Sequence, residues 1–305
     1  MENKKEKFAI VLAQFGTSYP SALSSLLKIQ NQVREAFPGV KISMAFTSNI
    51  IRKIWRKRRG DAAFLREHSD IPDEILHVRT PLAAIADLQD EGYSSIIVQP
   101  THVFEGVEYL DLKSCVDGLL AMTAVNPQQR PFKKIALGRP LLGKKGRQYP
   151  YFKDLEIAAG ALAPDITAAA ENHAALVYMG HGNEYLSSGI YLEFQEVLRK
   201  AYPGQGIYIG TVEGFPPVDY LVSELKRDGI KKVFLKPLMI VAGDHAINDM
   251  AGDEEDSWKT VLNAGGIEVI PAVQGLGENP EIGRIYIQHI RDAARDSGIE
   301  IGDGH

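Results

Sequence analysis

The 305-residue sequence predicts an α/β protein made of two similar lobes, each a parallel sheet flanked by helices. Short apolar segments alternate with amphipathic ones, which is the pattern of repeated β-α-β units and therefore of a parallel sheet. Residues 88–100 also align without gaps on residues 225–237, and both segments read as a helix end, a glycine, a strand and a proline. We therefore expect an N-terminal lobe at residues 1–150 and a C-terminal lobe at 151–305, with an active-site cleft between them. The closing helix at residues 280–296 is a candidate for packing back on the N-terminal lobe.

The N-terminal lobe is expected to begin with a buried strand at residues 8–15. An amphipathic helix follows at residues 21–37, because its leucines fall on one stripe and Pro38-Gly39 stops it. The segment at residues 60–73 is polar and predicts a loop or a short helix. The remaining predicted strands of this lobe cover residues 40–46, 95–100 and 133–137, and the remaining helices cover 50–59, 81–90 and 108–125.

The C-terminal lobe repeats this alternation. Its predicted strands cover residues 174–179, 206–212, 233–241 and 267–270, and its predicted helices cover 151–162, 190–201, 217–227, 257–263 and 280–296. The third of these strands is almost unbroken apolar sequence, turns at Ala242-Gly243, and then presents Asp244 and His245. Open α/β sheets bind ligands at the carboxyl ends of their strands, so this dipeptide is a candidate site. The simpler interpretation is that Asp244 caps a helix and His245 is a surface histidine.

Composition limits the class of protein. The chain is 45% apolar and 24% charged with a net charge of −5, which is typical of a soluble globular protein and indicates no general affinity for nucleic acid. A single cysteine, Cys115, excludes an intrachain disulfide and a cysteine-rich metal site. No signal peptide and no apolar run of about 20 residues is found. We expect a cytoplasmic protein without membrane contact; a homo-oligomer is neither predicted nor excluded.

Three ionisable residues fall at equivalent strand ends of the second lobe. His181 follows its first strand, Glu213 its second and His245 its third. Neighbouring parallel strands lie about 4.8 Å apart, so these side chains can converge. Two imidazoles and a carboxylate suit a divalent first-row metal. The internal repeat puts Thr17 and Glu108 of the first lobe at the matching places, so we expect the chemistry to be carried by the second lobe.

Other polar features have two interpretations each. Gly180-His-Gly182 resembles the start of a dinucleotide fingerprint, but the third glycine is missing, so nucleotide binding is unsupported. His102 follows Pro100 in the first lobe and is either a secondary contact or a packing residue. The basic helix at residues 50–59 is either a solvated face or a rim that attracts an anionic ligand.

Several motifs together are similar to a known family. They are Phe15-Gly-Thr-Ser-Tyr19, Ala45-Phe-Thr-Ser48, Met179-Gly-His-Gly182, Val212-Glu213 and the run from Pro237 to Ala251. With these motifs the chain resembles the anaerobic-type sirohydrochlorin cobaltochelatases, which are ATP-independent class II chelatases with a ferrochelatase-like fold. The segment at residues 60–73 is longer than is usual for the family, which affects the expected shape of the cleft rim.

The resemblance implies insertion of Co²⁺ into sirohydrochlorin, or a precorrin-2-like precursor, in anaerobic cobalamin biosynthesis. It implies His181, Glu213 and His245 as metal-binding residues, with His181 and Glu213 catalytic and His181 also accepting the pyrrole protons. No prosthetic group is expected; Co²⁺ is the metal substrate, and Fe²⁺ or Ni²⁺ are candidates in vitro. The residues expected to contact the tetrapyrrole are Thr17, Ser18, Arg52, Lys53, His102 and Glu108.

Three other functions remain open at this point. Iron insertion toward sirohaem would use the same ligands, because Fe²⁺ and Co²⁺ are adjacent in affinity order. A tetrapyrrole or metal carrier would bind without accelerating insertion. A zinc-dependent hydrolase would hold one zinc ion tightly, whereas a chelatase releases its metal into the product.

Overall fold

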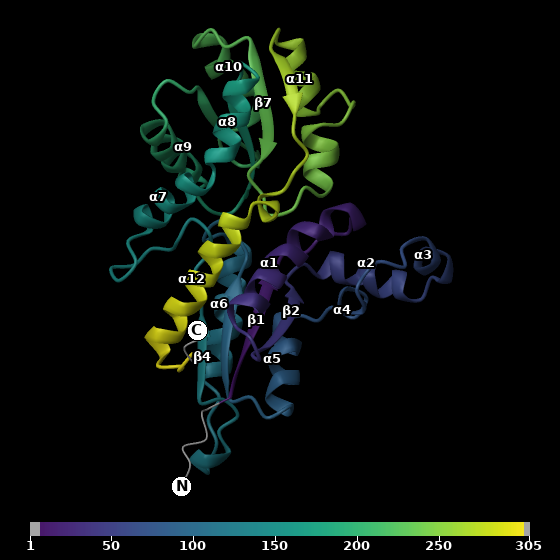
Figure 1. The fold of residues 1–305 in the computed structure, drawn as a ribbon, viewed down its shortest axis with the longest axis vertical. Coiled ribbons are helices and arrows are strands. Elements are labelled where there is room, and N and C mark those ends of the chain that lie inside the picture. Colours follow the sequence, from purple (N-terminus) through teal and green to yellow (C-terminus); the bar gives the residue numbers. More distant parts are fainter. Residues whose placement is uncertain (1–6, 302–305) are drawn as a thin grey trace. The chain divides into compact units, whose positions relative to one another are not determined.

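The computed structural model describes residues 7–301, and Figure 1 shows the order of its elements. The charged residues up to Glu6, which enter the signal-peptide prediction, lie outside that range. The chain divides into two compact units, one formed by the residues up to Pro140 and those from Gly283 onward, the other by Leu141–Ile282. The predicted boundary between the two lobes lies after residue 150. Residues just before that position pack on the second unit, since Gly143 lies against the Asp154 side chain.

The first unit contains a four-stranded parallel sheet in the order β2-β1-β3-β4. Its strands are β1 (Phe8–Gln14), β2 (Lys41–Phe46), β3 (Ser95–Pro100) and β4 (Lys134–Leu137). Its helices are α1 (Leu23–Ala36), α2 (Asn49–Arg59), α3 (Ala62–Glu67), α4 (Asp73–Leu76), α5 (Pro81–Asp90), α6 (Val107–Leu120) and α12 (Pro280–Ser297), the last of which begins just before the division.

Both faces of this sheet are covered, which explains why β1 is apolar at nearly every position. Val11 and Ala13 face one side and pack in a cluster with residues of α5 and α6. Ile10 and Leu12 face the other side and pack with residues of α1 and α12. Because successive side chains of a strand point to opposite faces, a continuous apolar run is what a doubly covered strand requires.

The second unit repeats the same strand order as β6-β5-β7-β8, again all parallel. Its strands are β5 (Ala175–Gly182), β6 (Ile207–Glu213), β7 (Lys232–Pro237) and β8 (Glu268–Pro271). Its helices are α7 (Tyr151–Ala161), α8 (Ala163–Glu171), α9 (Gly189–Ala201), α10 (Val218–Arg227), α11 (Trp258–Ala264) and the π-helix η3 (His245–Met250). The shared order supports the internal repeat and confirms the predicted α/β fold of two parallel sheets.

One polar group inside the second sheet needs an explanation. Lys236 stands in the apolar run of β7, and only 8% of its side chain is exposed. Its ammonium group forms an ion pair with Asp165 of α8, which also accepts a 2.7 Å hydrogen bond from the Tyr178 hydroxyl of β5. A buried lysine is tolerated here because its charge is paired and the carboxylate is hydrogen-bonded twice.

The prediction that the β7 strand runs to residue 241 was wrong. The strand ends at Pro237, where its pairing with Met179 of β5 is the last one, two residues after its last pairing with β8 at Leu235. After Pro237 the chain forms hydrogen bonds with the segment around Leu276 instead, where the Leu276 amide donates to the Met239 carbonyl. No helix within residues 7–301 is both long and apolar enough to cross a membrane.

Candidate active site

The end of β5 carries His181 between two glycines. A Cβ at Gly180 would lie 2.5 Å from the Tyr191 ring, and the Gly182 amide donates to the Tyr191 hydroxyl at 3.3 Å. Gly182 has φ +72°, and a Cβ there would lie 1.9 Å from the Glu213 carbonyl oxygen. The two glycines therefore let β5 approach α9 and β6 closely, and this close approach fixes where the His181 side chain begins.

Glu213 ends β6 directly opposite Gly182 in the parallel register. This pairing brings the His181 Nδ1 to 3.9 Å from the Glu213 Oε2. The turn after Glu213 is held by the Pro216 carbonyl, which accepts from the Thr211 amide at 2.7 Å. The first two predicted site residues are therefore neighbours.

His245 is the first residue of η3, whose Ala246 and Met250 are buried in the core cluster of the second unit. Its ring lies edge-on to that of His181, with centroids 4.9 Å apart and planes at 81°. Its Nδ1 is 2.5 Å from the Asp249 Oδ2, one helical turn further on. π-Helical turns occur often at functional sites, and this one presents a histidine beside another histidine.

His181, Glu213 and His245 are accessible to a small ligand. Their side chains are 31%, 41% and 34% exposed, respectively. The Nδ1 of His181 lies 3.0 Å from the Gly182 carbonyl, and the Nδ1 of His245 faces a carboxylate. Since a carbonyl and a carboxylate only accept hydrogen bonds, both neutral imidazoles carry their proton on Nδ1 and their lone pair on Nε2.

The residues described do not form a ready-made metal cage. In residues 7–301 no group of three or more His, Cys, Asp or Glu side chains is arranged to hold a metal ion. His181 is close to Glu213 and to His245, so the structure assembles two pairs that share His181. Side-chain rotation at these half-exposed groups is needed before all three contact one cation.

Among the residues predicted to contact substrate, Arg52 has a different role. Only 8% of it is exposed, and its guanidinium donates to the Phe46 and Thr47 carbonyls and to the Asn49 side chain. Burial, followed by repulsion from Arg56, lowers the pKa of Arg52. We therefore assign Arg52 to holding the end of β2 through these hydrogen bonds, and its contact with substrate stays a prediction.

Thr17 and Ser18 form the turn after β1 and are tied to α2. Thr17 is buried, its hydroxyl accepts from the Tyr19 amide, and its carbonyl accepts from the Trp55 indole at 2.7 Å. The Ser18 carbonyl accepts from Arg58. Their recorded contacts organise the turn.

His102, Glu108 and Lys53 lie in different surroundings. Burial lowers the pKa of His102 to about 4, so its imidazole is neutral near pH 7; its Nε2 lies 3.4 Å from the Thr47 hydroxyl. Glu108 stands in the first turn of α6, where a carboxylate is favoured by the helix dipole. Lys53 is exposed on α2, and its ammonium group is accessible to an anion.

Sequence reasoning did not select Asp249 or Tyr191 as site residues. Asp249 contacts His245, and its signal is the i,i+4 spacing from that histidine. Tyr191 supports the glycine-bracketed turn by accepting from the amide of Gly182, nine positions earlier, and no sequence signal links these two residues. Asp249 bonds to His245 directly, whereas Tyr191 bonds to the amide of Gly182 next to His181.

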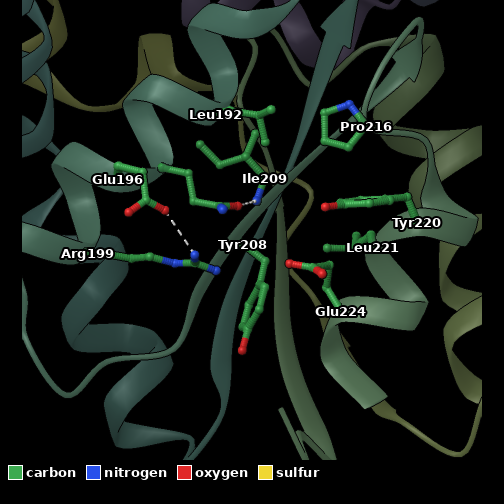
Figure 2. Close-up of a pocket in the computed structure, with 10 residues that line it drawn as sticks. Leu192, Glu196, Arg199, Tyr208, Ile209, Pro216, Tyr220, Leu221 and Glu224 are labelled. Atoms are coloured by element: carbon green, nitrogen blue, oxygen red, sulfur yellow. Dashed lines mark hydrogen bonds and ion pairs between the residues drawn. The ribbon is translucent and has the colours of Figure 1, made fainter. Parts of the chain in front are cut away.

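A separate hollow of about 280 Å³ lies along the open edge of β6 (Figure 2). Gln195 accepts from the Ile209 amide at 2.7 Å, and the Arg199 Nε donates to the Ile207 carbonyl at 2.8 Å. Arg199 also pairs with Glu196. None of the predicted site residues lines this hollow. Its polar groups protect the edge strand, so we assign it no ligand.

The fold and the histidine pair define a class of protein. Two parallel α/β units, with a histidine and a glutamate at strand ends of the second and a further histidine at the start of η3, are the architecture of a class II chelatase. A family model described as cobalt chelatase (CbiK) matches residues 8–295, so the chain belongs to the CbiK family of cobalt chelatases.

Two curated relatives are similar over nearly their whole length. The chain is 33% identical to sirohydrochlorin cobaltochelatase CbiKC of Nitratidesulfovibrio vulgaris over 287 residues, covering 94% of this chain and 90% of that protein. It is 31% identical to the sirohydrochlorin cobaltochelatase of Salmonella typhimurium over 289 residues, covering 94% and 96%.

Solved structures share the fold at low sequence identity. SirB from Bacillus subtilis with Fe³⁺ superposes with a TM-score of 0.59 at 13% identity, covering 97% of this chain and 98% of that one. The sirohydrochlorin chelatase SirB from Bacillus subtilis subspecies spizizenii in complex with cobalt gives 0.57 at 12% identity, with the same coverage. These likenesses confirm the chelatase-like fold.

Proposed function

We propose that this chain inserts Co²⁺ into sirohydrochlorin, without ATP, in anaerobic cobalamin biosynthesis. The observation that carries the proposal is the position of His181, at the end of β5, beside both Glu213 at the end of β6 and His245 at the start of η3. The names of the two curated relatives support the choice of metal and macrocycle.

Metal handling falls to the two imidazoles and the carboxylate. Each histidine places its lone pair on Nε2, which is the atom available to a divalent cation. Glu213 adds a negative charge beside His181 and lowers the electrostatic cost of bringing a cation there. Because these side chains are half-exposed and form no closed cage, they suit a metal that is passed on rather than kept.

Insertion replaces both pyrrole N–H protons of the macrocycle with bonds from nitrogen to cobalt, so those protons need an acceptor. We assign this role to His181, whose Nε2 lone pair takes a proton once the cation has moved to the macrocycle nitrogens, while Nδ1 stays bonded to the Gly182 carbonyl. Glu213, 3.9 Å from that ring, stabilises the imidazolium that results. Because His181 is partly exposed, it passes this proton to water and is then able to take the second one.

The macrocycle is flat and apolar on its faces, with carboxylates on its rim. Exposed aromatic side chains follow β5 and β6, namely Tyr185 at 82% and Phe215 at 48% exposure, and we propose that they pack against its faces. The exposed cations Lys53 and Arg56 of α2 are proposed for the carboxylates. Thr17, Ser18, His102 and Glu108 stay predictions as further contacts, as does a cytoplasmic location.

The test is anaerobic insertion of Co²⁺ into sirohydrochlorin followed by absorbance. His181→Ala and His245→Ala should each lower kcat/KM by about 100-fold or more, the range for loss of a proton acceptor or a metal ligand. His77→Ala is the matched control, because His77 is an exposed histidine that also faces an aspartate, at 3.1 Å. Activity of both site variants within a few-fold of the wild type would contradict the assignment.

The same assay separates the alternatives. Comparison of Co²⁺, Fe²⁺ and Ni²⁺ under identical conditions distinguishes cobalt insertion from iron insertion toward sirohaem. A carrier would bind the macrocycle or the metal while leaving the insertion rate at the uncatalysed value. Tightly retained zinc at one ion per chain would instead indicate the hydrolase.

A further inference from the structure

A short contact lies behind His245. Its Nδ1 is 2.5 Å from the Asp249 Oδ2, and the two residues are four positions apart on η3. The helix is fixed to the core by Ala246 and Met250, which alternate with the contacting pair and are fully buried. The imidazole and the carboxylate therefore lie on the accessible side of a short helix whose other side is packed in the core.

This contact determines which nitrogen of His245 is available. An ionised carboxylate only accepts hydrogen bonds, so the proton of the neutral imidazole must be on Nδ1 and the lone pair on Nε2. A carboxylate behind a histidine also makes that histidine a stronger electron-pair donor and restricts rotation of its ring. Asp249 is thus placed to prepare His245 for a metal without touching the metal itself.

We propose that Asp249 is a positioning residue that presents the His245 Nε2 to the incoming divalent cation. The inference rests on the proposed function and extends it to a residue behind the metal-binding pair. The Gly182 carbonyl and the Glu213 carboxylate lie farther from the His181 Nδ1, at 3.0 Å and 3.9 Å. His245 is accordingly the better donor toward the metal, which leaves His181 as the better placed residue to accept the pyrrole proton.

Another histidine–aspartate pair in the chain shows what an incidental contact looks like. His77 and Asp73 are also four positions apart, with Nδ1 3.1 Å from Oδ1, but their side chains are 50% and 87% exposed. The His77 Nδ1 is equally close to the Asp73 carbonyl, so its proton is shared between two acceptors. The His245–Asp249 contact is shorter and less exposed, and it lies on η3, whose first residue faces His181.

The test compares Asp249→Asn and Asp249→Glu with a matched control on the same helix. Asn248 donates to the Asp244 carboxylate at 2.8 Å, also at i,i+4 spacing, so Asn248→Ala removes a parallel contact that does not involve His245. For each variant, KM for Co²⁺, KM for sirohydrochlorin and kcat are measured separately. Binding of Co²⁺ to the protein alone is followed by its visible absorption, and folding is checked by circular dichroism.

Asp249→Asn should weaken the binding of Co²⁺ by about 10–100-fold, both in KM and in direct binding. This is the usual effect of removing a carboxylate behind a ligating histidine. The sirohydrochlorin KM should stay within about two-fold, Asp249→Glu should recover part of the loss, and Asn248→Ala should behave as the wild type. Co²⁺ binding by Asp249→Asn within about three-fold of the wild type would overturn the inference. Equal losses for metal and macrocycle, with an altered circular dichroism spectrum, would also overturn it.

Failure of the proposed function would look different. In that case the wild type itself does not accelerate cobalt insertion. Binding of Co²⁺ to the protein alone still compares wild type with Asp249→Asn, so the role of Asp249 behind His245 is tested whether or not insertion is observed.

Discussion

The substitution Gly182→Ala tests the close approach of β5 and β6 that places His181 beside Glu213. The added Cβ would lie 1.9 Å from the Glu213 carbonyl oxygen and 2.7 Å from the Thr211 Cβ, whereas real Cβ atoms essentially never come within 3.0 Å. The ends of the two strands must therefore part by about 1 Å. Alanine at φ +72° costs a further amount of about 1–2 kcal/mol, because the left-handed conformation crowds a Cβ.

A matched control separates these two costs. Gly229 has φ +71°, and no atom lies within 4 Å of a Cβ placed there. Gly229→Ala should thus lower the free energy of unfolding by about 1–2 kcal/mol. Gly182→Ala carries an additional crowding cost of about 1–3 kcal/mol, giving a total of about 2–5 kcal/mol.

The assay measures unfolding in urea by circular dichroism for both variants, together with cobalt insertion. A displacement of about 1 Å at reacting groups can lower a rate about 100-fold, so Gly182→Ala should lose activity while Gly229→Ala keeps it. The reasoning fails if the two variants have equal urea midpoints, or if Gly182→Ala retains activity within a few-fold of the wild type.

Two further predictions concern the first unit. Asp292→Ala should lower the free energy of unfolding by about 3–5 kcal/mol, because it leaves Arg139 buried without the carboxylate that now lies 2.7 Å from its Nη1. The control is the exposed Lys41–Glu91 pair: Glu91→Ala should lower the free energy of unfolding by less than about 1 kcal/mol in the same urea experiment. His102 has a pKa of about 4 in the folded protein, below the ordinary 6.5, so folding is favoured fully above pH 6.5 and this contribution is lost as the pH falls toward 4. Urea midpoints measured between pH 7 and pH 4.5 should fall less steeply for His102→Gln than for the wild type, and parallel slopes would contradict the burial of that imidazole.

The sequence was sufficient for the fold because its signals are local and repeated. Apolar runs, helix stripes and glycine stops predicted two parallel α/β lobes, and the structure confirms them. The end of β7 was misplaced because apolar residues continue past Pro237 although pairing with β8 stops at Leu235 and pairing with β5 stops at Pro237. A hydrophobic run indicates burial, whereas the end of a strand depends on where its pairing with neighbouring strands stops.

The candidate site shows a similar limit. The strand-end rule selected His181, Glu213 and His245, and the structure brings His181 next to each of the other two. It could not show that Arg52 turns inward, since a basic helix gives no sign of which guanidinium bonds to backbone carbonyls. The i,i+4 spacing of His245 and Asp249 was compatible with a contact, but the sequence did not show that a helix begins at His245 and brings the two side chains together. The predicted cleft between the lobes stays a prediction.

The placement of α12 has a consequence for the order in which the chain folds during synthesis. The second unit, Leu141–Ile282, is continuous in sequence and is complete before the ribosome has made most of α12. The first unit is not, because Ile287 and Ile290 of α12 cover the face of the sheet that carries Ile10 and Leu12. The nascent first sheet must therefore wait with an uncovered apolar face while the whole second unit is translated, which makes this interval the one in which a chaperone has most to protect.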